Sequence, residues 1–252
     1  MQKPQDYRAL SCAECKQGVD LGFEIDMAFQ PIIDVNRHTV FAHEALVRGS
    51  ENQSAGWVFS QVDDSNRYRF DQTCRLKAIK QASQLNKTIP LAINFLPNAV
   101  YQPELCIKAT LAAADTYQFP LDKLIFEFTE SEQMVDHQHI LNIVKHYKQL
   151  GFTIAIDDFG AGHSGLNLLA DIETDIVKLD MALIRHIDTD KKRQIIVQAA
   201  VDICNQLDIQ VIAEGIETRN EYLALRDTGI HLFQGYYFAK PAFKAFPEIS
   251  HY

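Results

Sequence analysis

The chain has 252 residues, 47% of them hydrophobic, which is enough to bury the core of one large domain. Its formal net charge of −9 excludes a general surface for DNA, RNA or an anionic membrane, because those partners require clustered Lys and Arg. An anionic small molecule stays compatible with this charge if metal ions bridge it to the protein.

Residues 1–24 lack sustained periodicity and are predicted to form an N-terminal extension. Cys12 and Cys15 have a spacing found in zinc and redox sites, but no second ligand pair and no βαβ unit accompanies them. The start of the chain lacks the apolar core of a secretion signal, and no run of about 18 apolar residues predicts a membrane span. We therefore expect a soluble, cytoplasmic protein with reduced thiols and no membrane partner.

From residue 25 onward, short β-rich runs alternate with segments of helical periodicity. No linker-like stretch interrupts them, so one domain over residues 25–248 is predicted. The predicted strands are Ala28–Ile33, Val40–Arg48, Ile89–Leu96, Lys123–Thr129, Phe152–Asp157, Asp175–Leu179, Ile209–Glu214 and Ile230–Tyr236. The predicted helices are Arg67–Leu85, Ala99–Tyr117, Gln138–Leu150, Lys192–Leu207 and Arg219–Asp227.

This order predicts an α/β fold, a TIM-like (β/α)8 barrel with an antiparallel first strand. The first strand is the exception because only about six residues separate Ile33 from Val40, too few for a crossover between parallel strands. An open doubly wound sheet is the alternative. It requires a glycine-rich phosphate-binding turn after an early strand, and the sequence has none there.

Polar residues recur within or at the ends of the apolar runs. They are Glu44, Asn94, Glu127, Asp157, Asp158, Lys178, Glu214 and Gln234. A carboxylate surrounded by apolar side chains costs several kcal/mol unless a cation or a hydrogen-bond donor meets it. The recurrence therefore predicts a shared metal-binding pocket at the C-terminal ends of the strands. Oxygen ligands favour Mg²⁺ or Mn²⁺, whereas zinc more often binds His or Cys.

Two local patterns sharpen this prediction. Residues Glu44, Leu46 and Arg48 share one face of a strand, which would project a carboxylate and a guanidinium together. A buried Glu44–Arg48 ion pair is the structural alternative. Asp157 and Asp158 close an apolar run before two glycines, and both can reach one site only if the chain turns there. A helix cap or a turn would explain one aspartate more easily than two.

Together these residues resemble the EAL family of cyclic di-GMP phosphodiesterases over about residues 25–245. The matching motifs are QPI at Gln30–Ile32, EALVR at Glu44–Arg48, NFLP at Asn94–Pro97, EFTE at Glu127–Glu130, DDFGAG at Asp157–Gly162, KLD at Lys178–Asp180, EGIE at Glu214–Glu217 and QGY at Gln234–Tyr236. The resemblance implies hydrolysis of cyclic di-GMP to linear pGpG with two divalent metal ions, Mg²⁺ or Mn²⁺. Calcium is expected to inhibit the reaction.

The resemblance also implies roles for individual residues. One metal would be held by Glu44, Asn94, Glu127 and Asp157, and the other by Asp157, Asp158 and Glu214. Lys178 would orient or help deprotonate the attacking water, acting with Glu44, Asp157 and Asp158 as the catalytic group. Substrate contacts are implied for Gln30, Leu46, Arg48 and Gln234. Supporting roles around the site are implied for Glu130 and Glu217.

The loop Phe159–Leu169 departs from the family pattern, with His163 in place of a common tyrosine and Gly165 in place of a common serine. In the family this loop links the metal site to a dimer interface, so a homodimer is expected, and His163 predicts pH-sensitive activity near neutrality. A regulatory protein partner is not identified. The alternative functions are a silent receptor for cyclic di-GMP, a protein adaptor or a structural barrel. The complete ligand set favours the enzyme.

Overall fold

The computed structural model describes residues 21–86, 88–129, 137–162 and 165–250. Eight strands form a closed ring in the order β2-β3-β4-β5-β6-β7-β8-β1, and a β1–β2 pairing closes it. They are β1 (Ile25–Asp34), β2 (Thr39–Gly49), β3 (Leu91–Asn94), β4 (Leu124–Thr129), β5 (Thr153–Phe159), β6 (Ile176–Leu179), β7 (Gln210–Ala213) and β8 (Leu232–Phe233).

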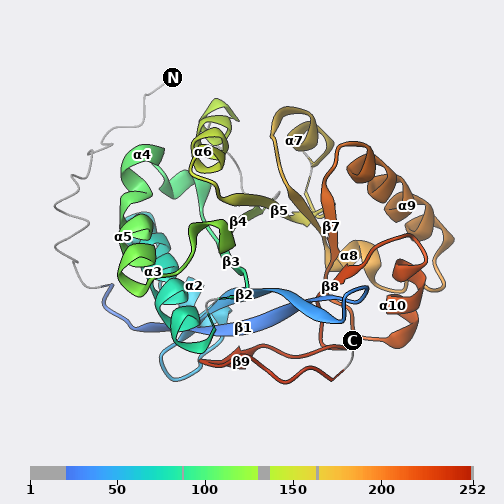
Figure 1. The fold of residues 1–252 in the computed structure, drawn as a ribbon, viewed down its shortest axis with the longest axis horizontal. Coiled ribbons are helices and arrows are strands. Elements are labelled where there is room, and N and C mark those ends of the chain that lie inside the picture. Colours follow the sequence, from blue (N-terminus) through green and yellow to red (C-terminus); the bar gives the residue numbers. More distant parts are fainter. Residues whose placement is uncertain (1–20, 87, 130–136, 163–164, 251–252) are drawn as a thin grey trace.

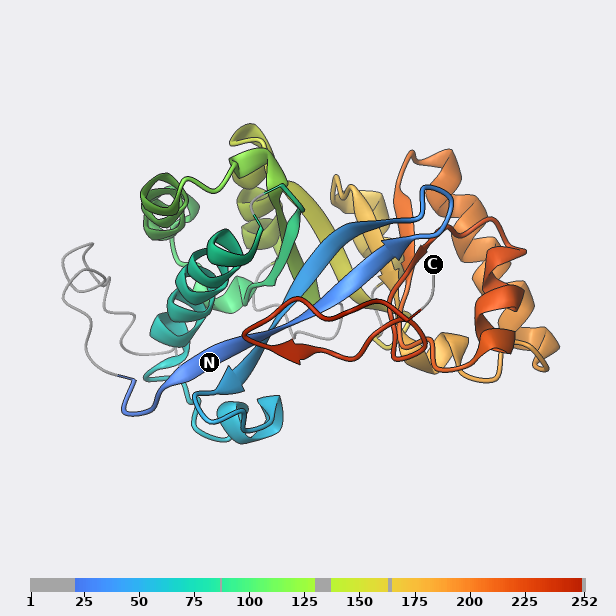
Figure 2. The same ribbon diagram turned by 60° about the horizontal axis from the view of Figure 1, so that its bottom comes forward.

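Strand β1 is antiparallel to both of its ring neighbours, β2 and β8, whereas the other ring pairs are parallel. The closed ring confirms the barrel with an antiparallel first strand and rules out the open doubly wound sheet. A ninth strand, β9 (Ala242–Phe243), pairs with β1 outside the ring and lies beside it (Figure 2).

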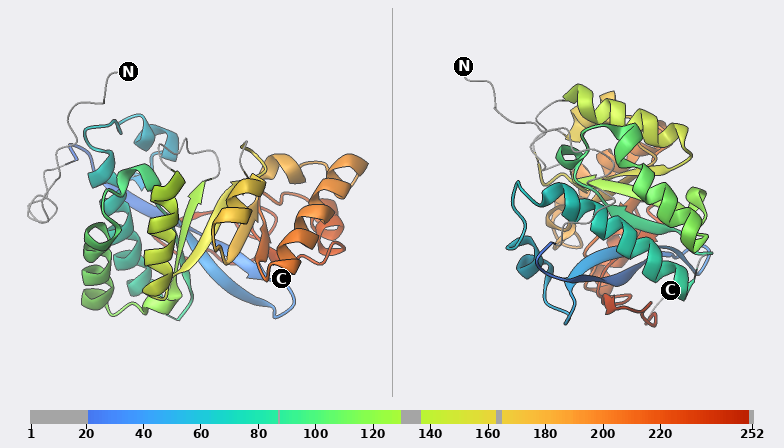
Figure 3. Two further views of the ribbon diagram at one scale, coloured as in Figure 1. Left: turned by 90° about the horizontal axis from the view of Figure 1, so that it is seen from above. Right: turned by 90° about the vertical axis from the view of Figure 1, so that its left-hand side faces the viewer.

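Helices α3 to α6 lie on one side of the strands, and helices α7 to α10 lie on the other (Figure 1, Figure 3). Their bounds are α2 (Ala55–Phe59), α3 (Arg67–Leu85), α4 (Pro103–Cys106), α5 (Lys108–Tyr117), α6 (His137–Gln149), α7 (Gly165–Asp171), α8 (Met181–Ile184), α9 (Lys191–Gln206) and α10 (Arg219–Arg226). Two 3-10 turns, Pro97–Ala99 and Leu121–Lys123, precede α4 and β4. Within the described residues, no helix combines the length and apolar character that crossing a bilayer requires.

The helix predicted over Ala99–Tyr117 is in fact two helices, α4 and α5. Pro103 opens α4 at a position where its missing N–H costs nothing, and Ile107 both ends α4 and precedes the longer α5. Helices α2, α7 and α8 and strand β9 were not predicted, because a helix of seven residues or fewer spans about two turns at most and a two-residue strand shows no alternation.

The inside of the barrel contains one apolar layer to which every ring strand contributes one buried residue. These residues are Ile32, Ala42, Ala92, Ile125, Ala155, Ile176, Ile212 and Leu232. A second, larger core fills the space between the strands and the helices. Because side chains alternate along a strand, this interior layer fixes which neighbouring residues face the same interior.

Candidate metal centre and active site

A polar layer lies directly above the apolar layer, because the residue two positions along each parallel strand faces the same way. The pairs are Ala42 with Glu44, Ala92 with Asn94, Ile125 with Glu127, Ala155 with Asp157, Ile176 with Lys178, Ile212 with Glu214 and Leu232 with Gln234. Strand β1 runs in the opposite direction, so Gln30 precedes Ile32. The sequence-predicted residues are thus brought together by strand geometry.

Lys178 occupies the middle of this polar layer and has no exposed surface. Its ammonium lies 2.7 Å from Glu214 Oε1, 3.0 Å from Glu127 Oε2, 3.1 Å from Asp157 Oδ1 and 3.5 Å from Glu44 Oε2. One positive charge therefore faces four carboxylates that come from four different strands or strand ends. The cluster carries more negative charge than its own lysine neutralises.

Amide side chains orient Glu44 within the cluster. Asn94 Nδ2 donates to Glu44 Oε1 at 2.8 Å, and Gln234 Nε2 donates to Glu44 Oε2 at 2.8 Å. Gln234 also lies 3.5 Å from Gln30 Oε1, and Gln30 in turn donates to the carbonyl of Ala239 at 3.1 Å. The two oxygens of Glu44 are thus held by side chains from either side of β2.

The two aspartates reach one site because β5 turns between them. Asp158 adopts a left-handed conformation with φ 54°, and the β5–β6 register shifts between Ile156 and Phe159. The Asp158 N–H donates to Asp157 Oδ1 at 2.9 Å. Aspartate tolerates this backbone region better than most residues. The turn that the sequence required for two converging carboxylates is present.

The carboxylates form two groups that share Asp157, and within each group ligand atoms lie within 4.8 Å of one another. One group is Glu44, Glu127 and Asp157, and the other is Asp157, Asp158 and Glu214. Among the described residues, the buried Oε1 of Glu127 has no hydrogen-bond partner. A buried carboxylate oxygen without a donor is costly, and a hard divalent cation would satisfy it. The residues therefore fit two such cations.

The electrostatics of the cluster have the same cause. Burial raises the pKa of Glu127 and of Glu214 well above the usual value, and the neighbouring carboxylates add to the effect. Burial together with Asp157 raises the pKa of Asp158 to about 6. Burial alone lowers the pKa of Lys178, but the carboxylates around it, Asp157 foremost, raise it well above its usual value. Positive charge is the missing component of this pocket.

A cavity of about 300 Å³ extends from Glu44, Asn94 and Asp157 toward helices α2 and α3. Leu46 and Arg48 line it, as the predicted substrate contacts require. Arg48 Nη1 donates to the carbonyl of Val47 at 2.8 Å, and Glu44 pairs with Lys178. No ion pair joins Glu44 to Arg48 within the described ranges, so the structural alternative for this motif is not observed.

Asp71 of α3 lines the same cavity and was missed by the sequence analysis. It accepts a hydrogen bond from the N–H of Leu96 at 2.9 Å and pairs with Arg75 at 2.5 Å. The only signal in the sequence is an aspartate four residues before an arginine on a helix, which is typical of a surface ion pair.

Glu217 belongs to neither carboxylate group; its Oε1 lies 3.0 Å from Arg185 Nη2. Gly165 is the first residue of α7. The predicted features at Glu130, His163, Cys12 and Cys15 lie outside the described residues.

The fold and the cluster define a TIM-like barrel with a candidate divalent-metal centre at the C-terminal edge of its strands. The chain belongs to the EAL domain family, whose model matches residues 16–241. This match confirms the family resemblance drawn from the motifs.

Two solved structures are similar to the chain over most of its length. A standalone versatile EAL protein from Vibrio cholerae O395 in a c-di-GMP bound form is 53% identical, with a TM-score of 0.89, and the match covers 92% of this chain and 98% of that one. Klebsiella pneumoniae BlrP1 in a manganese/cy-diGMP complex is 35% identical, with a TM-score of 0.83, covering 90% of this chain and 58% of that one.

Two curated relatives are similar as well. The blue light- and temperature-regulated antirepressor BluF of Escherichia coli is 33% identical over 226 residues, 88% of this chain and 56% of that protein. The cyclic di-GMP phosphodiesterase PA2567 of Pseudomonas aeruginosa is 32% identical over 234 residues, 89% of this chain and 39% of that protein. The chain thus spans about half the length of the curated relatives that it matches.

Proposed function

We propose that this chain hydrolyses cyclic di-GMP to linear pGpG with two divalent metal ions, Mg²⁺ or Mn²⁺, and so lowers a second-messenger signal. The observation that carries the proposal is the pair of carboxylate groups joined by Asp157. The relatives named as a cyclic di-GMP phosphodiesterase and as a manganese/cy-diGMP complex support it.

In this proposal Asp157, which belongs to both carboxylate groups, would contribute to holding each cation. Glu44, Asn94 and Glu127 would hold the first cation with it, and Asp158 and Glu214 the second. Cations bound there supply charge that offsets the repulsion between a phosphodiester and hydroxide, and they lower the pKa of water. Lys178, whose ammonium lies among these carboxylates, would orient the attacking water or help to deprotonate it. Gln234 would hydrogen-bond the surrounding water.

Substrate recognition is assigned to the cavity beside the cluster. Arg48 would contact a phosphate, whereas Leu46 and Gln30 would lie near a guanine. The change Arg48→Ala should raise KM by about tenfold or more, since hydrogen bonds to a charged group contribute about 1.5–3 kcal/mol. Manganese occupancy, measured by calorimetric titration, should stay unchanged because Arg48 belongs to neither carboxylate group.

The direct test incubates purified protein with cyclic di-GMP and Mg²⁺ or Mn²⁺ and follows pGpG by chromatography. Turnover that Ca²⁺ stops would support the proposal. Tight binding of cyclic di-GMP without turnover in either metal would contradict it and would select the silent receptor.

A protein adaptor is the second candidate function, favoured by the E. coli relative that is named an antirepressor. The intact ligand set argues for the enzyme, because an adaptor has no need of two converging carboxylate groups. An adaptor would keep its partner binding after Asp157→Asn, whereas the enzyme would lose turnover.

We also propose a homodimer. Large apolar residues are exposed on three helices: Leu166 is 64% exposed on α7, Met181 is 49% exposed on α8, and Ile195 and Ile196 are 59% and 52% exposed on α9. Analytical ultracentrifugation of the wild type and of Ile195→Glu would test it, since a monomeric wild type contradicts the dimer. The domain limits 25–248, the cytoplasmic location and the absence of nucleic-acid and membrane partners remain predictions.

A further inference from the structure

The loop after β7 begins with Glu214 and leads through Gly215, Ile216 and Glu217 to α10. Its backbone is tied to both neighbouring strand ends, because Glu214 N–H donates to Leu179 O at 3.3 Å and Ile216 N–H donates to Gln234 O at 3.1 Å. These bonds fix the path of the chain. Further contacts, from side chains, hold the residues that follow Glu214.

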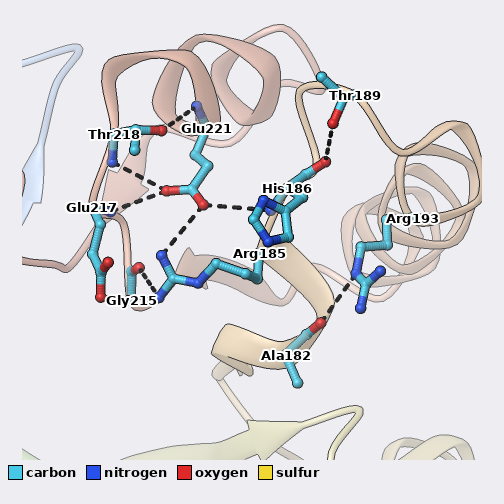
Figure 4. A network of polar contacts seen from close by, with 9 residues as sticks. All are labelled: Ala182, Arg185, His186, Thr189, Arg193, Gly215, Glu217, Thr218 and Glu221. Carbon is cyan, nitrogen blue, oxygen red and sulfur yellow. Dashed lines mark hydrogen bonds and ion pairs between the residues drawn. The ribbon is translucent and has the colours of Figure 1, made fainter.

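Glu221 is a buried carboxylate on α10 that joins two segments (Figure 4). Its Oε2 accepts from the N–H groups of Glu217 at 3.2 Å and Thr218 at 3.1 Å. Its Oε1 accepts from Arg185 Nη1 at 3.4 Å and from the N–H of His186 at 3.4 Å. One oxygen therefore holds the loop after β7, and the other holds the segment after α8.

Arg185 extends this link to the residue beside the candidate ligand (Figure 4). Its Nη2 donates to the carbonyl of Gly215 at 3.5 Å and to Glu217 Oε1 at 3.0 Å. Arg185 thus contacts the carbonyl of Gly215, the residue that directly follows Glu214. The buried Glu221 keeps the guanidinium in that place, because a charged pair held by several donors has little freedom to move.

The Arg185 contact also connects the loop to the segment that follows Lys178. Asp180 caps α8, which ends just before Arg185. Gly215 has φ 65°, and a Cβ there would approach Met181 Cγ to 2.7 Å, so α8 packs directly on the glycine. The Lys178–Glu214 contact, at 2.7 Å, is the shortest of the four lysine contacts. The ends of β6 and β7 are therefore held together as one unit.

We infer that Arg185 and Glu221 are positioning residues that set the place of Glu214, and through it the affinity of the group Asp157, Asp158 and Glu214 for the second cation. The inference rests on the proposed two-metal function. Neither residue is part of either carboxylate group, and neither contacts Lys178 in the interactions described above.

Helix capping is the simpler explanation for Glu221, because Thr218 and Glu221 form a capping box at the start of α10. Arg185 separates the two explanations, since it takes no part in that box. A structural role alone would lower the stability of α10 equally with and without metal. A positioning role would weaken one metal-binding event and leave the other.

The test titrates Mn²⁺ into the wild type and Arg185→Met, with calorimetry and electron paramagnetic resonance as readouts. The wild type should bind two ions. In Arg185→Met one ion should bind about 10–100-fold more weakly, as is usual when the group supporting a ligand is lost. The other should change by less than about twofold. At saturating Mn²⁺ the variant should recover most of kcat, so that the defect lies in metal dependence.

Two further variants serve as a control and as a second test. Arg193→Met is the matched control: Arg193 also contacts α8, at the carbonyl of Ala182, and pairs with Asp190, but it does not reach the loop of Glu214. It should bind both ions as the wild type does. Glu221→Gln should reproduce the loss at one site. Circular dichroism and thermal unfolding in chelator establish that each variant is folded.

Equal binding of both ions by Arg185→Met and the wild type would overturn the inference while leaving the proposed function in place. Equal weakening of both ions would also overturn it. A wild type that binds fewer than two ions, or binds two and leaves cyclic di-GMP intact, would count against the proposed function. In the first of these cases the inference would fall with it.

Discussion

Two cationic side chains are fully buried, Lys178 inside the barrel and Arg75 outside it, and they differ in the number of carboxylates around them. Arg75 pairs with one carboxylate, Asp71, and donates to the hydroxyl of Tyr147 at 3.0 Å. The rings of Phe95 and Phe126 lie 5.5 and 5.6 Å from its guanidinium carbon. Lys178 faces four carboxylates instead.

The contrast separates a structural ion pair from a binding site. The Arg75 site pairs one cation with one carboxylate, although Asp71 lines the cavity beside the carboxylate cluster, and it fixes Leu96 close to the end of β3 through Asp71. The Lys178 site places four carboxylates around one cation, next to the same cavity. A protein tolerates surplus buried charge where an added ion completes it. The balance of charge, more than burial, marks the candidate metal centre.

The largest effect is expected from a change at Asp157, the carboxylate that both groups share. Asp157→Asn should lower turnover of cyclic di-GMP by about a thousandfold or more, because metal-ion catalysis contributes several kcal/mol and each 1.4 kcal/mol is about tenfold. Stability in chelator should not fall with it, since three other carboxylates still face Lys178. Asp122→Asn, at an exposed carboxylate, is the control. Turnover within tenfold of the wild type would contradict the shared role.

The next largest effect is expected from breaking the buried ion pair between Arg75 and Asp71. Arg75→Met should lower the free energy of unfolding by about 3–5 kcal/mol, because it leaves the carboxylate of Asp71 buried without its cation. Urea denaturation would measure the change. The double variant Arg75→Met with Asp71→Leu should recover part of the loss. A single variant as stable as the wild type would show that the site is not a tightly buried pair.

At a third site two lysines surround one carboxylate, that of Asp26, and this arrangement predicts a dependence of stability on pH. Asp26 lies 2.7 Å from Lys244 and 3.5 Å from Lys77, and Gln81 donates to it at 2.5 Å. Burial alone raises the pKa of Asp26, but these neighbours lower it below the usual value of 3.8. A depressed pKa stabilises the folded state above about pH 4, and that stability is lost as the pH falls through the folded pKa.

Asp26→Asn should therefore cost about 1–2 kcal/mol of stability at pH 7, and the difference from the wild type should shrink toward pH 2. Denaturation at both pH values would measure it. Asp227→Asn, at an exposed carboxylate beside Arg226, should stay within about 0.5 kcal/mol throughout. A cost for Asp26→Asn that is the same at pH 2 and pH 7 would contradict the assigned pKa direction.

The smallest expected effect removes one hydrogen bond from the balanced site. Tyr147→Phe should cost about 1 kcal/mol, since Arg75 keeps its carboxylate and its aromatic neighbours. A loss as large as that of Arg75→Met would mean that the tyrosine, rather than the ion pair, holds the site together.

The strands and their polar residues were predictable because each strand joins a period of two to an interruption of its apolar run. Glu127 and Lys178 were found through that signal, whereas Gln30 was implied only by the family resemblance. Asp71, Arg185 and Glu221 were not, because a polar residue on or beside a helix resembles an ordinary solvated or capping group until the fold shows what it faces. The turn at Asp158 could be required from the sequence, but its left-handed backbone could only be observed.

On the parallel strands, each interior apolar residue is followed, two positions along the chain, by a polar residue of the cluster. The register of a strand therefore sets both the packing of the interior and the position of its polar residue. A slip of one residue in a strand such as β4 would turn Ile125 and Glu127 outward together. Such a slip would therefore remove the interior packing and the polar cluster together. Selection for a well-packed apolar layer therefore also preserves the polar layer above it.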